Sequence, residues 1–146
     1  MSFSKPGRIA AAAGLALVLL AGLCAVSQAQ ISVVIAKSAT HAPSMDDIKA
    51  YFSAIKFTWS DGAKVEVVDQ PETALAESFY TKLVGKSMSQ IRKDWTKLIL
   101  SGQAAAPTKC AGDDEVKKAV AGNPNAIGFI ATSALDGTVK EIGKLE

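Results

Sequence analysis

The sequence has few of the residues on which metal, redox or hydrolytic chemistry depends. Its 146 residues include two cysteines and a single histidine, His41. A zinc site needs several Cys or His ligands together, and a Ser-His-Asp triad needs a histidine beside a nucleophile. The chain has no G-x-S-x-G turn and no group of paired carboxylates with catalytic spacing. We therefore expect no metal, no cofactor and no enzymatic activity.

The chain also lacks an excess of charge once its N-terminal segment is set aside. It carries 16 Lys and Arg residues against 14 Asp and Glu residues. Lys5 and Arg8 are two of the 16 bases and no acid precedes residue 30, so 14 bases remain against 14 acids. A balanced domain is not strongly attracted to nucleic acid or to an anionic membrane surface. We expect neither as a partner.

Residues 1–29 are typical of an export signal. A basic start precedes an almost wholly apolar run from Ile9 to Val26, and Ser27-Gln28-Ala29 supplies the small residues of a cleavage site. A retained membrane anchor is one alternative, but the run is short for a span and no basic stop-transfer cluster follows it. A lipoprotein modified at Cys24 is another, against which the bulky Leu23 argues. Cleavage would leave residues 30–146 as one periplasmic or secreted domain, free of the membrane.

Cleavage would also leave Cys110 as the one remaining thiol, so no disulfide could form within the domain. A redox or metal role is one interpretation of this residue. A small, partly buried core residue is the interpretation that we favour, because no second cysteine accompanies it.

Hydrophobic patterns predict an α/β domain in which helices cover a small mixed sheet. The β-branched run at residues 31–36 and the segments 64–68, 126–131 and 138–142 are predicted strands. The predicted helices cover residues 45–54, 72–83 and 113–121, and a further helix begins after Ser87 and ends at Gly102. Capping boxes mark two helix starts, at Ser44 and Ser87. Gly128, inside a strand, indicates close backbone packing or a bulge.

Met88, Trp95 and Trp59 admit two interpretations. They could form a set of side chains on which a ligand stacks. Their spacing is more typical of residues that face a hydrophobic core, which is the interpretation that we favour.

Three segments in order resemble the phosphate ABC transporter substrate-binding proteins, members of the type II periplasmic solute-binding class. The first is MDDIKAYFSAIKFTWSDGAKVEVVDQ, with Trp59, Asp61 and Gly62 in the family's places and Tyr51-Phe52-Ser53-Ala54 where the family has Ile-Phe-x-Gly. The second is ESFYTKLVGKSMSQIRKDWTKLILSGQAAAP, and the third is DDEVKKAVAGNPNAIGFI. The most specific matches are Asn123-Pro124 and Ala126-Ile127-Gly128, together with Trp59 and Trp95.

The resemblance implies a single lobe of a periplasmic-binding-protein-like fold. Full-length members close two lobes over phosphate. In them the loop after the strand that corresponds to residues 64–68 carries an arginine and a Gly-Ser-Gly-Thr tract that clamp the anion. Here the arginine position falls on Gln70, and of the hydroxyls only Thr73 remains, beside the acidic Glu72. An arginine fork and backbone N–H groups would otherwise supply the charge-assisted hydrogen bonds.

Two hypotheses follow. The first is an exported, non-enzymatic solute-binding-like protein that holds phosphate or another small oxyanion weakly, through Gln70 and Thr73 with Ser38 and Thr40 from the loop after residues 31–36. An ABC permease would then be a further partner. The second is an envelope protein–protein interaction module in which the anion site has degenerated. These four residues also have ordinary structural explanations: Thr73 caps a helix, and Ser38 and Thr40 are loop residues.

Overall fold

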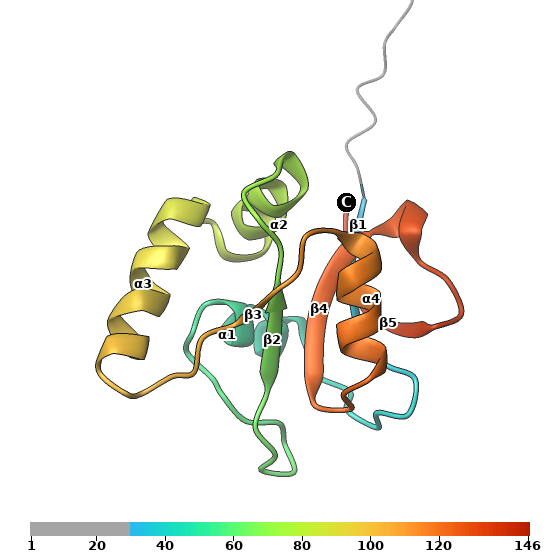
Figure 1. Ribbon diagram of the computed structural model, residues 1–146, viewed down its shortest axis with the longest axis horizontal. Coiled ribbons are helices and arrows are strands. Elements are labelled where there is room, and N and C mark those ends of the chain that lie inside the picture. The colour runs from blue at the N-terminus through green and yellow to red at the C-terminus, as the bar shows by residue number, and fades with distance from the viewer. Residues whose placement is uncertain (1–29) are drawn as a thin grey trace, which may run out of the picture.

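The computed structural model describes residues 30–146, so the expected signal segment lies outside the described residues. Five strands and four α-helices follow one another with a short 3₁₀ turn before the last strand (Figure 1). They are β1 Ile31–Ala36, α1 Met45–Phe52, β2 Glu66–Asp69, α2 Ala74–Val84, α3 Met88–Leu100, β3 Thr108–Lys109, α4 Asp113–Ala121, β4 Ala126–Ala131, η1 Thr132–Ala134 and β5 Val139–Leu145. The predicted α/β class and the mixed sheet are confirmed.

The strands form one sheet in the order β3-β2-β4-β1-β5. β2 runs parallel to β3 and to β4, whereas β1 runs antiparallel to both of its neighbours, β4 and β5. The carboxyl ends of β2 and β4 therefore lie at the same edge of the sheet as the amino end of β1. This edge is called the β2–β4 edge below.

Helices cover the two faces of the sheet unequally (Figure 1). Alternate residues of β1, beginning with Ile31, face a large core to which α1, α2 and α3 contribute. Val34 and residues of β2, β4 and β5 face the other way, where Val116 and Val120 of α4 cover them. This alternation follows from the two-residue period of a strand, and it buries β1 completely.

Side-chain caps fix the helix starts close to the predicted positions. Ser44 and Ser87 each form both halves of a capping box, as predicted. Thr73 accepts a hydrogen bond from the backbone N–H of Ala76 and caps α2. α4 covers residues 113–121, as predicted, and begins after Gly112, which makes no side-chain cap.

The end of α1 is formed by a residue that rarely adopts the required conformation. Ala54 has a φ angle of 58° and is the one non-glycine residue of the described chain with positive φ. The N–H of Ile55 bonds to the carbonyl of Ala50, and the N–H of Ala54 bonds to that of Tyr51, which is the Schellman pattern. α1 therefore ends two residues earlier than predicted. Gly102 holds the equivalent place after α3, with φ of 75°.

Replacing Ala54 by glycine is expected to stabilise the protein by up to about 1 kcal/mol. The left-handed conformation costs an alanine roughly 1–2 kcal/mol, part of which is offset by the greater freedom of glycine in the unfolded chain. Urea unfolding would measure the change, with Gly102→Ala as the opposite substitution in the same motif. Gly102→Ala should destabilise, and a loss of stability in Ala54→Gly would contradict this account.

Two differences from the predicted strands concern the β2 side of the sheet. The predicted strand 64–68 is observed as Glu66–Asp69, because Lys64 and Val65 pair with residues 57 and 58 in a local hairpin. The two-residue strand β3 was not predicted, since the sequence before it reads as a connector.

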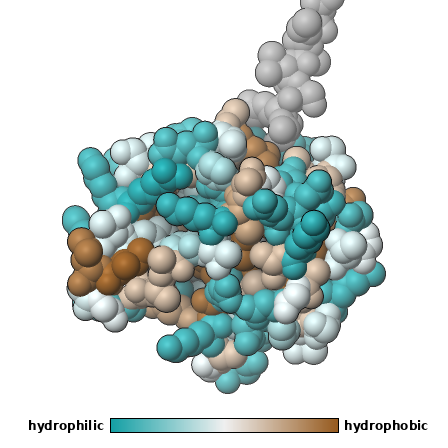
Figure 2. Space-filling model, viewed as in Figure 1, coloured by the Kyte–Doolittle hydropathy of each residue, from teal (hydrophilic) through white to brown (hydrophobic). Residues whose placement is uncertain are grey.

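The surface shown in Figure 2 is mainly hydrophilic, with a hydrophobic area over the end of α3, where Leu100 is 82% exposed.

Candidate functional site

The four predicted site residues do not lie together. Gln70 and Thr73 follow β2 and lie at the β2–β4 edge. Ser38 and Thr40 follow the carboxyl end of β1, which lies level with the amino ends of β2 and β4 because Ile35 pairs with Ile127. The two pairs are therefore at opposite edges of the sheet. The expectation that Ser38 and Thr40 join Gln70 and Thr73 in one site is wrong, because β1 runs antiparallel to β4.

The side chain of Gln70 is engaged inside the protein. It is 3% exposed, and its Nε2 donates hydrogen bonds to the carbonyl oxygen of Phe129 at 2.8 Å and to Oδ1 of Asp113 at 2.9 Å. These bonds join the end of β2 to β4 and to the first residue of α4. An anion at this edge would have to compete for the amide donors and would meet the Asp113 carboxylate.

The other three predicted residues are exposed, and each stands at a place where the local backbone explains it: a helix cap or a turn. Thr73 is exposed and its hydroxyl accepts from Ala76 N–H at 3.3 Å, which is its capping role. Ser38 and Thr40 are exposed on either side of Ala39, whose N–H closes a turn onto the carbonyl of Ala36. Such hydroxyls can still reach a ligand from solvent.

A buried carboxylate lies directly before Gln70. Asp69 is 7% exposed, and its Oδ1 accepts hydrogen bonds from the Tyr80 hydroxyl at 2.8 Å and from the Gln70 N–H at 2.8 Å. Burial raises the pKa of Asp69 above its ordinary value, although both hydrogen bonds and the positive charge of Arg92 act in the opposite direction. Burial and the adjacent Asp69 carboxylate raise the pKa of Tyr80 well above its ordinary value.

The raised pKa of Asp69 predicts a specific pH dependence. The folded protein binds this proton more tightly than the unfolded chain does, so Asp69 favours folding below pH 4 and this contribution is lost as pH rises through its folded pKa. In Asp69→Asn the oxygen acceptor remains and the titration is absent. The free energy of unfolding of Asp69→Asn minus that of wild type should therefore increase between pH 4 and pH 7.

Urea unfolding at several pH values would measure this difference. Asp94→Asn is a matched control, because hydrogen bonding to Lys86 lowers the pKa of Asp94 and places its titration below pH 4. The difference between Asp94→Asn and wild type should stay nearly constant from pH 5 to pH 7. A constant difference for Asp69→Asn as well would contradict the titration of Asp69 in the folded state.

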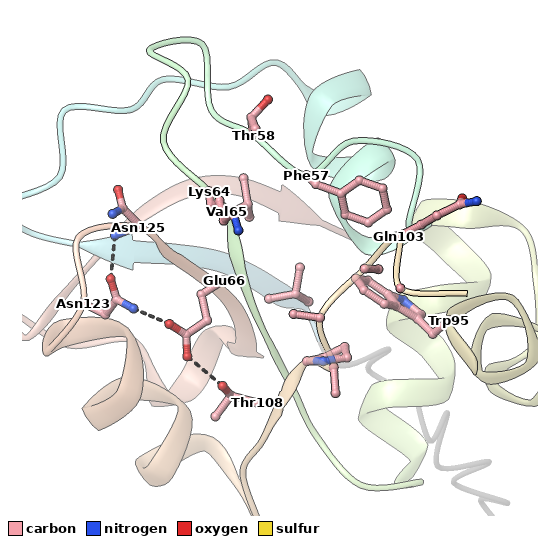
Figure 3. A pocket seen from close by; sticks show the side chains of 16 residues that line it. Phe57, Thr58, Lys64, Val65, Glu66, Trp95, Gln103, Thr108, Asn123 and Asn125 are labelled. Atoms are coloured by element: carbon pink, nitrogen blue, oxygen red, sulfur yellow. Dashed lines mark hydrogen bonds between the residues drawn. The ribbon is translucent and has the colours of Figure 1, made fainter. Parts of the chain in front are cut away.

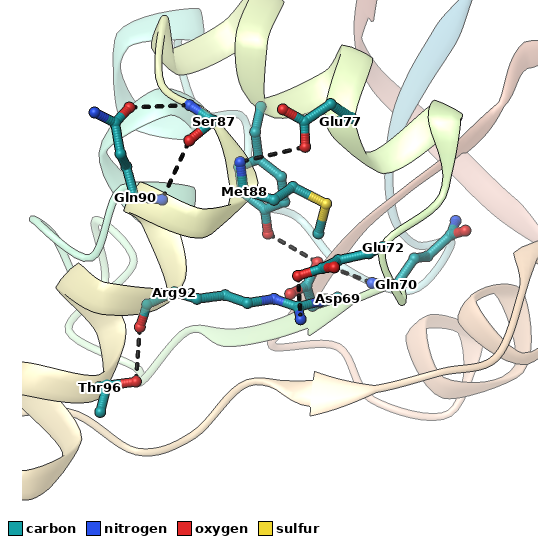
Figure 4. Close-up of polar contacts among 10 residues, drawn as sticks. Asp69, Gln70, Glu72, Glu77, Ser87, Met88, Gln90, Arg92 and Thr96 are labelled. Atoms are coloured by element: carbon teal, nitrogen blue, oxygen red, sulfur yellow. Dashed lines mark hydrogen bonds and ion pairs between the residues drawn. The ribbon is translucent and has the colours of Figure 1, made fainter.

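A guanidinium that the sequence patterns did not indicate lies near the β2–β4 edge. The side chain of Arg92 extends from α3 toward Glu72 at the start of α2, and its Nη1 donates to Oε1 of Glu72 at 2.7 Å (Figure 4). The side chains of Arg92 and Glu72 are 37% and 62% exposed. Arg92 lies near enough to Asp69 for its charge to lower the pKa of that carboxyl. No local sequence pattern predicts this contact, because its two partners are 20 residues apart in the chain.

Two small hollows lie on either side of Glu72. One, of about 470 Å³, is lined on α3 by basic residues and hydroxyls: Ser89, Arg92, Lys93, Thr96 and Lys97. The other, of about 340 Å³, lies where the first turns of α2 and α3 approach each other, and Thr73, Ser87 and Ser89 are among its lining residues. Glu72 borders both hollows. This part of the surface, next to the β2–β4 edge, is the candidate site.

A larger hollow lies elsewhere. It has a volume of about 760 Å³ and is bordered by the amino-terminal part of β2, the end of α3 and the connector before β3 (Figure 3). Glu66 lies in it and accepts hydrogen bonds from Thr108 and Asn123. Ligands of open α/β sheets bind outside the carboxyl ends of strands. The position of this hollow at amino ends therefore does not favour it over the β2–β4 edge.

The other candidates from the sequence are core residues. Trp59, Trp95 and Met88 are buried, as the favoured interpretation predicted. Cys110 is also buried, and burial raises the pKa of its thiol, which makes the reactive thiolate less available.

Within residues 30–146, no group of three or more His, Cys, Asp or Glu residues is placed to hold a metal ion. No helix in that range is both long and apolar enough to cross a bilayer.

Comparison with solved structures shows the fold. The chain is similar to a protein of Clostridium perfringens described as a phosphate ABC transporter substrate-binding protein and solved with bound phosphate. The TM-score is 0.63 at 20% sequence identity, over 78% of this chain and 45% of that one. It is also similar to an ABC-type phosphate transport receptor of Vibrio cholerae, with a TM-score of 0.61 at 17% identity, over 78% of this chain and 47% of that one.

The chain thus spans less than half the length of these two structural neighbours. No family model matches its sequence, and no curated protein does. What the comparisons show is that residues 30–146 adopt the architecture of one lobe of a periplasmic-binding-protein-like fold.

Proposed function

We propose that the protein is an exported, non-enzymatic solute-binding-like protein that holds a small oxyanion weakly at the β2–β4 edge. Phosphate is the leading candidate, and the periplasm, or secretion after removal of residues 1–29, is the proposed location. The observation that supports this proposal is the similarity of the lobe to a protein solved with bound phosphate. An ABC permease is the partner that such a role would bring.

Three features at this edge support weak binding. The Gln70 amide is engaged with Phe129 and Asp113. The carboxylates of Glu72 and Asp113 add negative charge beside any anion. Thr73 remains as an exposed hydroxyl at the start of α2, whereas Ser38 and Thr40 lie at the opposite edge and are not part of this proposal. A dissociation constant in the millimolar range, equivalent to about 4 kcal/mol of binding free energy, is expected.

Calorimetric titration with inorganic phosphate and with sulfate at constant ionic strength tests the proposal. Saturable binding of phosphate at millimolar concentration is the expected result. Absence of a saturable signal at tens of millimolar phosphate would contradict it. The Arg92→Gln variant would distinguish binding of phosphate near Glu72, which this substitution should weaken, from non-specific attraction of phosphate to the protein surface.

A second candidate function is an envelope protein–protein interaction module. The engagement of Gln70 favours it, because two of its hydrogen bonds close the edge from within. This function predicts that phosphate leaves the melting temperature unchanged and that a stable partner is captured from the periplasm in a pull-down experiment. A phosphate-dependent rise in melting temperature would argue against it.

A further inference from the structure

The contact between Arg92 and Glu72 resembles an arginine–anion contact in which the protein supplies its own anion. Arg92 donates through Nη1 to one oxygen of Glu72, and this is the one side-chain hydrogen bond that its guanidinium makes within residues 30–146. Nε of Arg92 is buried and has no hydrogen-bond acceptor among the described residues. A buried donor without a partner is unfavourable, so the guanidinium is only partly satisfied by Glu72.

The surroundings of Glu72 favour negative charge. Arg92, Lys93 and Lys97 line the hollow on one side of it, and Lys93 and Lys97 make no ion pair with any acid of the described chain. The other hollow lies where the first turns of α2 and α3 meet and helix dipoles are positive, and there the carboxylate of Glu77 already accepts a hydrogen bond from the N–H of Met88. The Glu72 carboxylate thus lies beside the three basic residues of α3.

Glu72 is also able to leave this position. Its side chain is more than half exposed, and it precedes the cap of α2 rather than lying within the helix. Exposed ion pairs of this kind contribute little to stability. A tetrahedral oxyanion presents several oxygens and can accept two parallel hydrogen bonds from a guanidinium, which a single Glu72 oxygen does not.

We propose that Glu72 is an internal competitor for an oxyanion site on α3, in which Arg92 supplies the guanidinium that is missing at position 70. The inference rests on the proposed oxyanion binding and specifies how that binding is limited. Lys93 contributes charge and Ser89 a hydroxyl to the same site. Phosphate binds after the Glu72 carboxylate has swung away, and the apparent affinity is lowered by this competition.

The test is phosphate titration of the wild-type protein and of Glu72→Gln at constant ionic strength, followed by calorimetry or by NMR of α3 amides. Removing the competing carboxylate should increase phosphate affinity by a factor of up to about five, the factor by which an exposed ion pair of this kind favours its closed form. Arg92→Gln in the Glu72→Gln background should abolish the gain, and Arg92→Lys should retain only part of it, because lysine lacks the planar fork.

Asp94→Asn is the matched control. Asp94 lies on α3, like Arg92, and its carboxylate is 2.8 Å from Nζ of Lys86. The substitution therefore removes one acidic charge near the site and leaves the ion pair of Arg92 with Glu72 in place. An equal gain in Asp94→Asn would overturn the proposal, because net charge alone would then explain the effect. Circular dichroism and melting temperature would verify that each variant is folded.

The outcomes separate this inference from the proposed function. Equal millimolar binding by wild type and Glu72→Gln would leave the proposed function standing and overturn the role of Glu72. Binding by Glu72→Gln alone would support the role of Glu72 and contradict phosphate binding by the native protein. Absence of binding by both proteins would overturn both.

Discussion

Replacing Phe79 by alanine is expected to lower the free energy of unfolding by about 3–5 kcal/mol. Phe79 is fully buried between the sheet and α1. Its ring stacks on Phe129 of β4 with 3.9 Å between ring centroids and meets Phe52 of α1 edge-on at 4.7 Å. Truncation removes the contact that joins a helix, a strand and a second helix, and it leaves a cavity that neighbouring rings cannot fill without moving.

Urea-induced unfolding followed by circular dichroism would measure the loss. Leu100→Ala is the control, because this large apolar side chain at the end of α3 is mainly exposed and its truncation should change stability by no more than about 0.5 kcal/mol. Similar losses in the two variants would contradict the assignment of Phe79 to the centre of the core.

Replacing Gly128 by valine is expected to destabilise the protein by about 3 kcal/mol or more, and Gly128→Ala by about 1–3 kcal/mol. A Cβ atom at position 128 would lie 2.8 Å from Cγ1 of Val116 and 3.1 Å from Cγ2 of Val120. These methyl groups belong to stiff β-branched side chains on α4. The helix would therefore have to move away from β4 to accept any side chain there.

Gly143→Ala provides the comparison in β5. A Cβ atom there would lie 2.9 Å from Sδ of Met45 and 3.2 Å from Cδ1 of Ile48. Met45 is long, flexible and 41% exposed, so it can move aside at little cost. Thermal unfolding should show a clearly larger loss for Gly128→Ala than for Gly143→Ala. The reverse order would contradict close packing of α4 on β4.

Local patterns were sufficient to predict most elements of the fold. The capping boxes at Ser44 and Ser87 and the glycine after α3 placed helix ends because caps depend on a few adjacent residues. Gly128 correctly indicated close backbone packing, here beneath α4. The two-residue strand β3 was missed because so short a segment has no period of its own. The early end of α1 was missed because alanine rarely takes the conformation of Ala54.

The candidate site depended on information that the sequence does not display. The direction of β1 in the sheet decides whether Ser38 and Thr40 can approach Thr73, and a buried β-branched run has the same pattern in either direction. The family resemblance directed attention to Gln70, where an arginine is absent. It did not indicate that Arg92 reaches the same region from α3, because that contact depends on how α2 and α3 pack against each other.

The buried thiol of Cys110 has a practical consequence. The backbone N–H of Cys110 donates to the carbonyl of Asp69, so this residue directly follows the edge strand β3 and lies beside the candidate site. In a chain cleaved after residue 29, an aromatic disulfide reagent could react with this sulfur alone, and only while β3 is transiently separated from β2. The rate of labelling would then report how often the two strands separate, and a solute that holds α3 against the end of β2 would lower that rate.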